Sequence, residues 1–388
     1  HDTVATTIDT FNTVLKLMAE FPEFYFSQSQ ASVYEIIEKY NPEMLEKIAE
    51  RIKEGHWEVT ASHWVECDKN LTGDEALCRH LLYTRQYMKK LFGLNAEDVE
   101  IDWAPDTFGH GATVPSYLVR GGVKYVYMHR PGTIGGETKP HIFWWKAPDG
   151  SKVIVRNDSR DGYNGAINPA MLEHFFDFIK ETKLPYFMFV YGVGDHGGGP
   201  TRNDIRYGIE MNKWPVFPEI RFAKSSDFFK RVEKDSAKLP VIEGELNFEF
   251  AGCYTTQTLI KKCNRFAENR INDAENIASL INGINGFKYK EQAFQQSWLN
   301  TLFSQFHDIL PGSGIHDTRT YTHGHFQNTM ANILSEKTKA LRAFAQIVDT
   351  SFAESELKAS ENFPESVTRA MGAGSGFMSS QFQITQSE

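Results

Sequence analysis

Short apolar segments with the character of β-strands alternate with helical stretches along residues 1–240, and this alternation restricts the fold more than any other feature of the sequence. The predicted strands are residues 24–26, 56–61, 99–103, 124–129 and 186–190. Apolar residues at helical spacing occupy much of the chain between them. Repeated strand–loop–helix units favour a parallel sheet covered by helices, either open or closed into a barrel. We therefore expect an α/β fold.

Two local signals refine this expectation. Residues 143–145 and 152–156 flank the turn Pro148-Asp149-Gly150, which predicts an inserted β-hairpin. Thr72 and Glu75 have the spacing of a capping box, which predicts the start of a helix at this point.

The pattern changes near Leu239, because residues 258–348 are predominantly helical with breaks at 283–286 and 310–314. Three helices joined by short loops predict an antiparallel bundle. The residues after Phe352 are polar and have no strong periodicity. The expected domains are an α/β domain at 1–240, a three-helix bundle at 241–350, and a linker or the start of a missing β-domain at 351–388.

Composition excludes several classes of partner. A formal net charge of -9 leaves no basic surface for nucleic acid or anionic membranes, and no run reaches the ~18 apolar residues that span a bilayer. The four cysteines form no C-x-x-C pair, so neither a disulfide framework nor a cysteine zinc cluster is expected. Reduced cysteines are typical of a cytoplasmic protein. We expect no nucleic-acid or membrane partner, and the sequence leaves homo-oligomerisation open.

Each of two predicted strands leads into a loop that carries one carboxylate. Strand 99–103 precedes Asp106, and strand 186–190 precedes Asp195 within the glycine-rich segment 191–201. Functional residues of α/β folds gather on loops at the carboxyl ends of strands. Either aspartate alone would most simply be a turn residue. A pair, however, is what cleavage of a glycosidic bond requires, and the glycine-rich segment lacks the G-K-[ST] of a phosphate-binding loop.

His307 is the third candidate residue. It lies at the expected C-terminal end of the second bundle helix, next to Asp308. A lone histidine at this position can simply complement the helix dipole. Near a carboxylate pocket it becomes a candidate zinc ligand, because neutral imidazole and carboxylate oxygens both bind Zn²⁺.

A series of segments carries a resemblance to a known family. The segments are Phe26–Gln30, Trp64–Leu71, Trp103–Gly109, Gly192–Thr201, Gly244–Leu246 with Tyr254–Gln257, and Gln305–Ser313. In this order they resemble glycoside hydrolase family 38, the class II α-mannosidases, in its bacterial and cytosolic branch. The resemblance covers nearly the whole chain. It implies a parallel β/α barrel in residues 1–240, followed by the helical bundle, and hydrolysis of mannose-containing oligosaccharides or glycosides with Zn²⁺ as cofactor.

The resemblance also assigns roles to individual residues. Asp106 is the expected nucleophile and a zinc ligand, His307 is a zinc ligand supplied by the helical bundle, and Asp195 is the expected general acid/base. The residues expected to contact the sugar are Trp103, Phe108 and Tyr254, with Asp68 and Asn70 near the pocket.

One feature of the family is absent. Relatives supply two further zinc ligands from an H-x-D pair followed by Trp near the N-terminus, and His1-Asp2 has the wrong spacing to replace it. We therefore expect an incomplete barrel whose first strand and two ligands are missing from this chain. Because zinc sites normally use three or four protein ligands, we expect this fragment alone to bind zinc poorly and to be inactive.

The implied reaction is a double displacement with retention. Asp106 attacks the anomeric carbon, while Asp195 protonates the leaving oxygen and then activates water. Two alternatives remain open. One is a zinc-dependent carbohydrate deacetylase or amidohydrolase that uses Asp106 and His307 to activate water; the other is a catalytically incomplete sugar-binding module. The sequence does not define linkage preference or aglycone.

Overall fold

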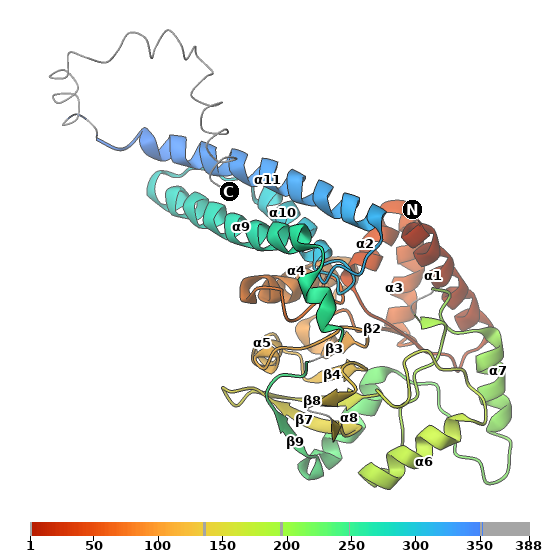
Figure 1. Ribbon diagram of the computed structural model, residues 1–388. Helices are drawn as coiled ribbons and strands as arrows, with labels where there is room; N and C mark the ends of the chain where they lie inside the picture. The colour runs from red at the N-terminus through yellow and green to blue at the C-terminus, as the bar shows by residue number, and fades with distance from the viewer. Residues whose placement is uncertain (1, 135–136, 195–196, 248, 350, 352–388) are drawn as a thin grey trace. The chain divides into compact units, whose positions relative to one another are not determined.

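The computed structural model describes residues 2–134, 137–194, 197–247, 249–349 and 351 (Figure 1). Contacts divide the chain into two compact units, His1–Asn276 with Lys290–Glu336, and Ile277–Tyr289 with the residues from Lys337 onward. All described strands belong to the first unit. No helix within these described ranges is both long and apolar enough to cross a membrane.

The first part of the chain forms a two-stranded parallel sheet with three helices. Its elements are α1 (Asp2–Glu20), β1 (Phe26–Gln28), α2 (Ala31–Tyr40), α3 (Pro42–Lys53) and β2 (Trp57–Val59). Phe26 pairs with Trp57, whose buried ring lies 5.0 Å from that of Phe11 in α1. Both predicted strands are therefore present, and the one expected at 24–26 is displaced to 26–28.

The largest sheet has five strands. They are β3 (Ile101–Ala104), β4 (Tyr125–Met128), β7 (Ile142–Lys146), β8 (Lys152–Asn157) and β9 (Val241–Glu243), in the order β3-β4-β8-β7-β9. Strands β3, β4 and β8 are parallel, β7 is antiparallel to β8, and β9 is parallel to β7. Strands β5 (Thr133–Ile134) and β6 (Glu137–Thr138) form a separate antiparallel pair. The fold is therefore mixed α/β, and the predicted strands at 99–103 and 124–129 are confirmed.

The predicted hairpin is also confirmed, but it is not an insertion. Its second strand, β8, pairs with β4 and lies in the middle of the five-stranded sheet. Val153, Ile154 and Val155 are all at most 1% exposed. A continuous apolar run of this kind is typical of a strand buried on both faces.

Residues 186–190 do not form the predicted strand. None of these five residues is in a strand, and the isolated bridge nearest to them pairs Tyr191, just beyond the stretch, with Gly165. The side chains of Phe187 and Val190 pack against the core on one face of the large sheet. The apolar residues that suggested a strand therefore contribute to packing without a ladder of backbone hydrogen bonds.

Helices cover both faces of the five-stranded sheet. They include α5 (Val114–Arg120), α6 (Met171–Thr182) and α8 (Ser225–Asp235), and α7 (Arg202–Met211) precedes α8. Alternate strand residues point to opposite faces, so Val126 packs with Leu118 of α5 whereas Tyr127 packs with Phe178 of α6 and Phe229 of α8. The loops at the carboxyl ends of β3, β4 and β8 leave the sheet at one common edge.

Helix α4 (Asp74–Phe92) begins one residue later than the predicted capping box requires. Gly73 is its N-cap residue, and the cap makes no side-chain hydrogen bond. The amide of Gly73 donates instead to Glu268 Oε1, at 2.8 Å. The capping role predicted for Thr72 and Glu75 is therefore wrong, because a carboxylate from a distant helix binds the helix terminus.

The three predicted C-terminal helices are present as α9 (Thr258–Asn285), α10 (Glu291–Ser304) and α11 (His316–Ala345) (Figure 1). Within the first unit, Gln305 donates to Asn264 of α9 at 2.8 Å, and Asn300 of α10 donates to Asn328 of α11 at 3.1 Å. Polar side chains of α10 and of Gln305, which directly follows it, therefore link this segment to the other two helices.

Candidate active site

Asp106 and His307 meet although 201 residues separate them. Asp106 follows β3 and His307 follows α10, and Asp106 Oδ2 lies 3.1 Å from His307 Nε2. The imidazole is 3% exposed, whereas the aspartate is only partly buried. The structure therefore brings together these two of the three expected site residues.

Glu66 joins the two segments from which these side chains come. Its Oε1 accepts hydrogen bonds from the amides of Asp106 and Thr107, at 2.7 and 2.8 Å. Its carbonyl oxygen accepts from the amide and Nδ1 of His307, at 3.1 and 3.0 Å. Sequence reasoning assigned no role to Glu66, although it lies within the segment Trp64–Leu71 that carries part of the family resemblance.

Arg130 was also missed. It follows β4, the strand adjacent to β3, and its Nε donates to Asp106 Oδ1 at 2.5 Å. Its Nη1 also contacts Glu249 Oε1 at 3.3 Å. The rule that functional residues follow parallel strands could have found Arg130, because the strand expected at 124–129 ends next to it.

These contacts control the ionisation of the site. Burial raises the pKa of Asp106, but the hydrogen bond and charge of His307, followed by those of Arg130, outweigh burial and lower this pKa to about 2. Burial lowers the pKa of His307, whereas the charge of Glu66 and the hydrogen bond to Asp106 raise it to about 9. The surroundings of His307 therefore favour positive charge.

The residues could hold a metal ion. Asp106, His307 and Asp308 each offer one ligand atom, and these atoms lie within 4.8 Å of one another. Because His307 Nδ1 donates to a carbonyl, the neutral imidazole would direct the lone pair of Nε2 at a carboxylate oxygen. Two acceptors at 3.1 Å require a proton or a cation between them. Nitrogen and oxygen donors of this kind suit Zn²⁺, so the donor set fits the expected cofactor.

Aromatic side chains surround part of this cluster. Phe108 is 5% exposed, and its ring lies 5.8 Å from that of His307. Phe250 contacts Phe108 at 5.1 Å and lies beneath the guanidinium of Arg130 at 4.8 Å. Burial, then the charge of Asp106 and a side-chain hydrogen bond to it, raises the pKa of the Tyr163 hydroxyl. Tyr163 is thus a further residue near Asp106 that sequence reasoning did not identify.

The other expected sugar contacts lie in different surroundings. Trp103 is stacked on Tyr127 at 3.9 Å and packs against the core of the sheet. The hydroxyl of Tyr254 donates to Asp68 Oδ2 at 2.8 Å and accepts from Asn70 at 3.1 Å. Tyr254 therefore belongs to a polar group around Asp68. Burial raises the pKa of Asp68, and its hydrogen bonds and the charge of His307 oppose this effect.

Asp195 lies outside the described residues, so its expected role stays a prediction. Two described glycines that precede it have defined surroundings. Gly192 donates to the Gly165 carbonyl at 2.9 Å, two residues beyond Tyr163. Gly194 has φ 72°, and a Cβ there would lie 1.6 Å from Asn164 Oδ1, so a larger residue would strain the backbone and displace the Asn164 side chain.

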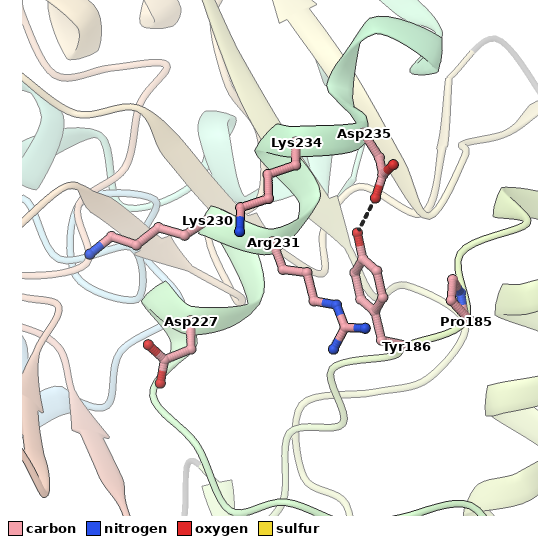
Figure 2. Close-up of a pocket in the computed structure, with 7 residues that line it drawn as sticks. All are labelled: Pro185, Tyr186, Asp227, Lys230, Arg231, Lys234 and Asp235. Carbon is pink, nitrogen blue, oxygen red and sulfur yellow. Dashed lines mark hydrogen bonds between the residues drawn. The ribbon is translucent and has the colours of Figure 1, made fainter.

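A surface pocket of different character lies beside α8. It is lined by Pro185, Tyr186, Asp227, Lys230, Arg231, Lys234 and Asp235 (Figure 2). The Tyr186 hydroxyl donates to Asp235 at 3.0 Å, and Arg231 lies 4.2 Å from the Tyr186 ring (Figure 2). None of these residues belongs to the Asp106 cluster, so we do not assign the candidate active site to this pocket.

Comparisons with known proteins agree with the arrangement of the chain. Residues 1–245 match the family model "Glycosyl hydrolases family 38 N-terminal domain", and residues 249–347 match "Alpha mannosidase middle domain". Alpha-mannosidase G of Dictyostelium discoideum is 32% identical over 309 residues, covering 79% of this chain and 28% of that protein. Human alpha-mannosidase 2C1 is 30% identical over 308 residues, covering 78% of this chain and 29% of that protein.

A solved structure has the same fold. The crystal structure of an α-mannosidase from Enterococcus faecalis V583 is similar with a TM-score of 0.79 at 19% identity, covering 90% of this chain and 41% of that one. The present chain thus spans less than a third of the length of the two curated relatives described above.

Proposed function

Because this chain belongs to glycosyl hydrolase family 38, as the match over residues 1–245 shows, we propose that it is the catalytic core of a retaining, zinc-assisted α-mannosidase. The substrates would be oligosaccharides, glycans or glycosides with a terminal α-linked mannose. The observation that carries the proposal is the 3.1 Å approach of Asp106 Oδ2 to His307 Nε2.

Asp106 suits the role of nucleophile. The Arg130 guanidinium and His307 hold its pKa near 2, so the carboxylate is ionised at neutral pH. Its backbone is fixed by Glu66, which keeps the attacking oxygen oriented before substrate binds. Attack on the anomeric carbon would form a glycosyl-enzyme intermediate, as in other retaining glycosidases.

Asp195 is proposed as the general acid/base. It would protonate the leaving oxygen in the first step and remove a proton from water in the second. Gly165 donates to the Val190 carbonyl at 3.2 Å and accepts from the Gly192 amide at 2.9 Å. These bonds support the assignment, because Gly165 is two residues from Tyr163, which interacts with Asp106. Phe108 and Trp103 are proposed to contact the sugar ring, and Tyr254 a sugar hydroxyl.

Zinc would be held by Asp106 and His307, with Asp308 as a third donor in this chain. When bound, the metal would supply a Lewis acid that binds the vicinal 2- and 3-hydroxyls of mannose. Arg130 and Glu66 would then orient Asp106, and the Glu66 carbonyl would orient His307.

The finer architecture is likewise proposed. The two parallel-containing sheets would be parts of one incomplete β/α barrel in residues 1–240, with a three-helix bundle at 241–350 and a linker or β-domain start at 351–388. Most of the last segment lies outside the described residues. The free state of all four cysteines supports a cytoplasmic location.

The test is hydrolysis of an aryl α-mannoside by the full-length protein, followed by ¹H NMR. Release of α-mannose as the first-formed anomer is expected. Release of β-mannose would refute retention. Acetate release from an acetylated sugar without glycosidic cleavage would instead favour the deacetylase alternative.

A further inference from the structure

We propose that Glu66 is a positioning residue that sets the separation between the Asp106 loop and His307. The proposal deepens the proposed function and rests on it, because this separation defines the nucleophile and metal-ligand pair. Glu66 itself touches neither sugar nor metal in this scheme, so its effect passes through the two residues that it holds.

The side chain of Glu66 fixes the Asp106 loop. One oxygen, Oε1, accepts from the amides of Asp106 and Thr107 and from Thr107 Oγ1, at 2.7, 2.8 and 3.2 Å. Glu66 is 8% exposed, so water does not replace these bonds readily. Hydrogen bonds to a charged acceptor in a buried position are among the stronger ones in proteins.

The main chain of Glu66 fixes His307. The Glu66 carbonyl accepts from the His307 amide, Cys67 forms an antiparallel bridge with Phe306, and the Asp68 amide donates to Gln305 at 2.8 Å. These contacts set one register between residues 66–68 and 305–307. The same carbonyl accepts from His307 Nδ1 at 3.0 Å, which directs Nε2 at Asp106. One residue thus links both halves of the site.

Glu58 offers a matched control. Its carboxylate also accepts two consecutive amides and one hydroxyl, from Ser225, Ser226 and Ser27, at 2.8, 3.0 and 2.6 Å. It is similarly buried, at 9% exposure. These bonds fix the start of α8 and not the candidate site. Loss of either carboxylate removes a comparable set of hydrogen bonds.

The experiment compares Glu66→Ala, Glu66→Gln and Glu58→Ala in the full-length protein. Crystal structures give the Asp106 Oδ2–His307 Nε2 distance, calorimetry gives Zn²⁺ affinity, and kinetics give kcat and KM. In E66A we expect a longer distance, a ~10- to 100-fold loss of Zn²⁺ affinity and a similar fall in kcat, as for other residues that orient metal ligands. E66Q keeps an acceptor oxygen but loses the charge, so it should keep the wild-type distance while Zn²⁺ affinity and kcat fall less than in E66A, because the amide carbonyl can make the same three bonds.

E58A should unfold at a lower temperature but keep the wild-type distance and affinity. An unchanged distance in E66A would overturn the proposal, and so would an equal loss of Zn²⁺ affinity in E58A, which would show a general effect of instability. Absence of α-mannoside hydrolysis in the wild type would reject the proposed function alone. The distance in E66A would still decide whether Glu66 positions the two residues.

Discussion

Arg130 Nε donates to Asp106 Oδ1 at 2.5 Å, from the end of the strand adjacent to the one that Asp106 follows. Parallel pairing of Trp103 with Tyr127 and of Ala104 with Met128 places both loops at the same edge. The other oxygen of Asp106 faces His307. Two cationic or proton-bearing groups thus approach one carboxylate from separate elements, which orients it and keeps it ionised.

Arg130→Met should lower kcat with a smaller effect on KM. A hydrogen bond to a charged group contributes roughly 1.5–3 kcal/mol, which corresponds to a loss of about 10- to 100-fold in rate. The measurement is steady-state hydrolysis of an aryl α-mannoside by the full-length protein. Arg231→Met, in the surface pocket of Figure 2, is the control and should leave kcat unchanged. Equal effects of the two substitutions would contradict a specific role for Arg130.

Asp106→Ala should abolish turnover and weaken zinc binding together, because one carboxylate serves both purposes in the proposed site. Zinc titration by calorimetry and kinetics on the same preparation measure the two effects. Circular dichroism checks that the variant is folded. Wild-type zinc affinity in folded D106A would separate the nucleophile from the metal site and refute the shared role.

Asp195→Ala should slow substrates with poor leaving groups more than substrates with good ones. A general acid contributes about 10²- to 10⁴-fold where protonation of the leaving oxygen is needed. The dinitrophenyl α-mannoside is the internal control, because its leaving group departs without a proton. The measurement is kcat/KM for this substrate divided by kcat/KM for a methyl mannoside, compared between D195A and the wild type. The same loss on both substrates would argue against Asp195 as the acid.

The rule that functional residues follow parallel strands identified Asp106, because a short apolar strand, a proline turn and an acid are all local signals. The same rule reached Arg130 in principle, since the strand at 124–129 was predicted one residue before it. A pattern of paired carboxylates does not point to a cation, so the sequence alone left Arg130 without a role. The convergence of Asp106 and His307 came from the family resemblance and is present in the structure.

Glu66 had no comparable local signal. Its partners are the Asp106 amide, 40 residues away, and the amide and Nδ1 of His307, 241 residues away, and only the tertiary fold brings them together. The strand predicted at 186–190 is absent for a different reason. Its apolar residues pack against the sheet, but their backbone does not pair with it. Local composition reports how apolar a segment is, whereas pairing depends on neighbours that are distant in sequence.

The buried pair of Lys69 and Asp102 should be important for stability. The Lys69 ammonium contacts Asp102 Oδ2, and their side chains are 1% and 3% exposed. Lys69→Met would leave a buried carboxylate 3.3 Å from Nδ1 of His63, a histidine whose pKa is lowered by burial. Loss of the ammonium should therefore cost about 3–5 kcal/mol. Chemical denaturation measures this loss.

An exposed ion pair provides the comparison for Lys69. Lys146 and Glu243 lie 2.7 Å apart on neighbouring strands, with side chains 42% and 65% exposed. Lys146→Met should cost no more than about 1 kcal/mol. If K69M lost as little free energy of unfolding as K146M, the buried Lys69–Asp102 pair would contribute no more to stability than an exposed pair.

Lys139 should make stability depend on pH in the alkaline range. The side chain is buried, its ammonium donates to the Pro131 carbonyl, and burial lowers its pKa to about 7, against a weaker opposing effect of Glu249. Between this pKa and the ordinary lysine value of about 10.4 the unfolded chain binds more protons than the folded one. Stability therefore rises with pH across this window.

Lys139→Met removes this contribution, so the difference between variant and wild type isolates it from other titrating groups. Denaturation of both proteins at a series of pH values from 6 to 10 should show the wild type gaining free energy of unfolding relative to K139M above pH ~7. Below that pH the ammonium is charged in both states and the difference should be constant. A difference that stays flat up to pH 10 would mean that the folded protein accommodates the buried charge without penalty, and that the pKa of Lys139 is not depressed.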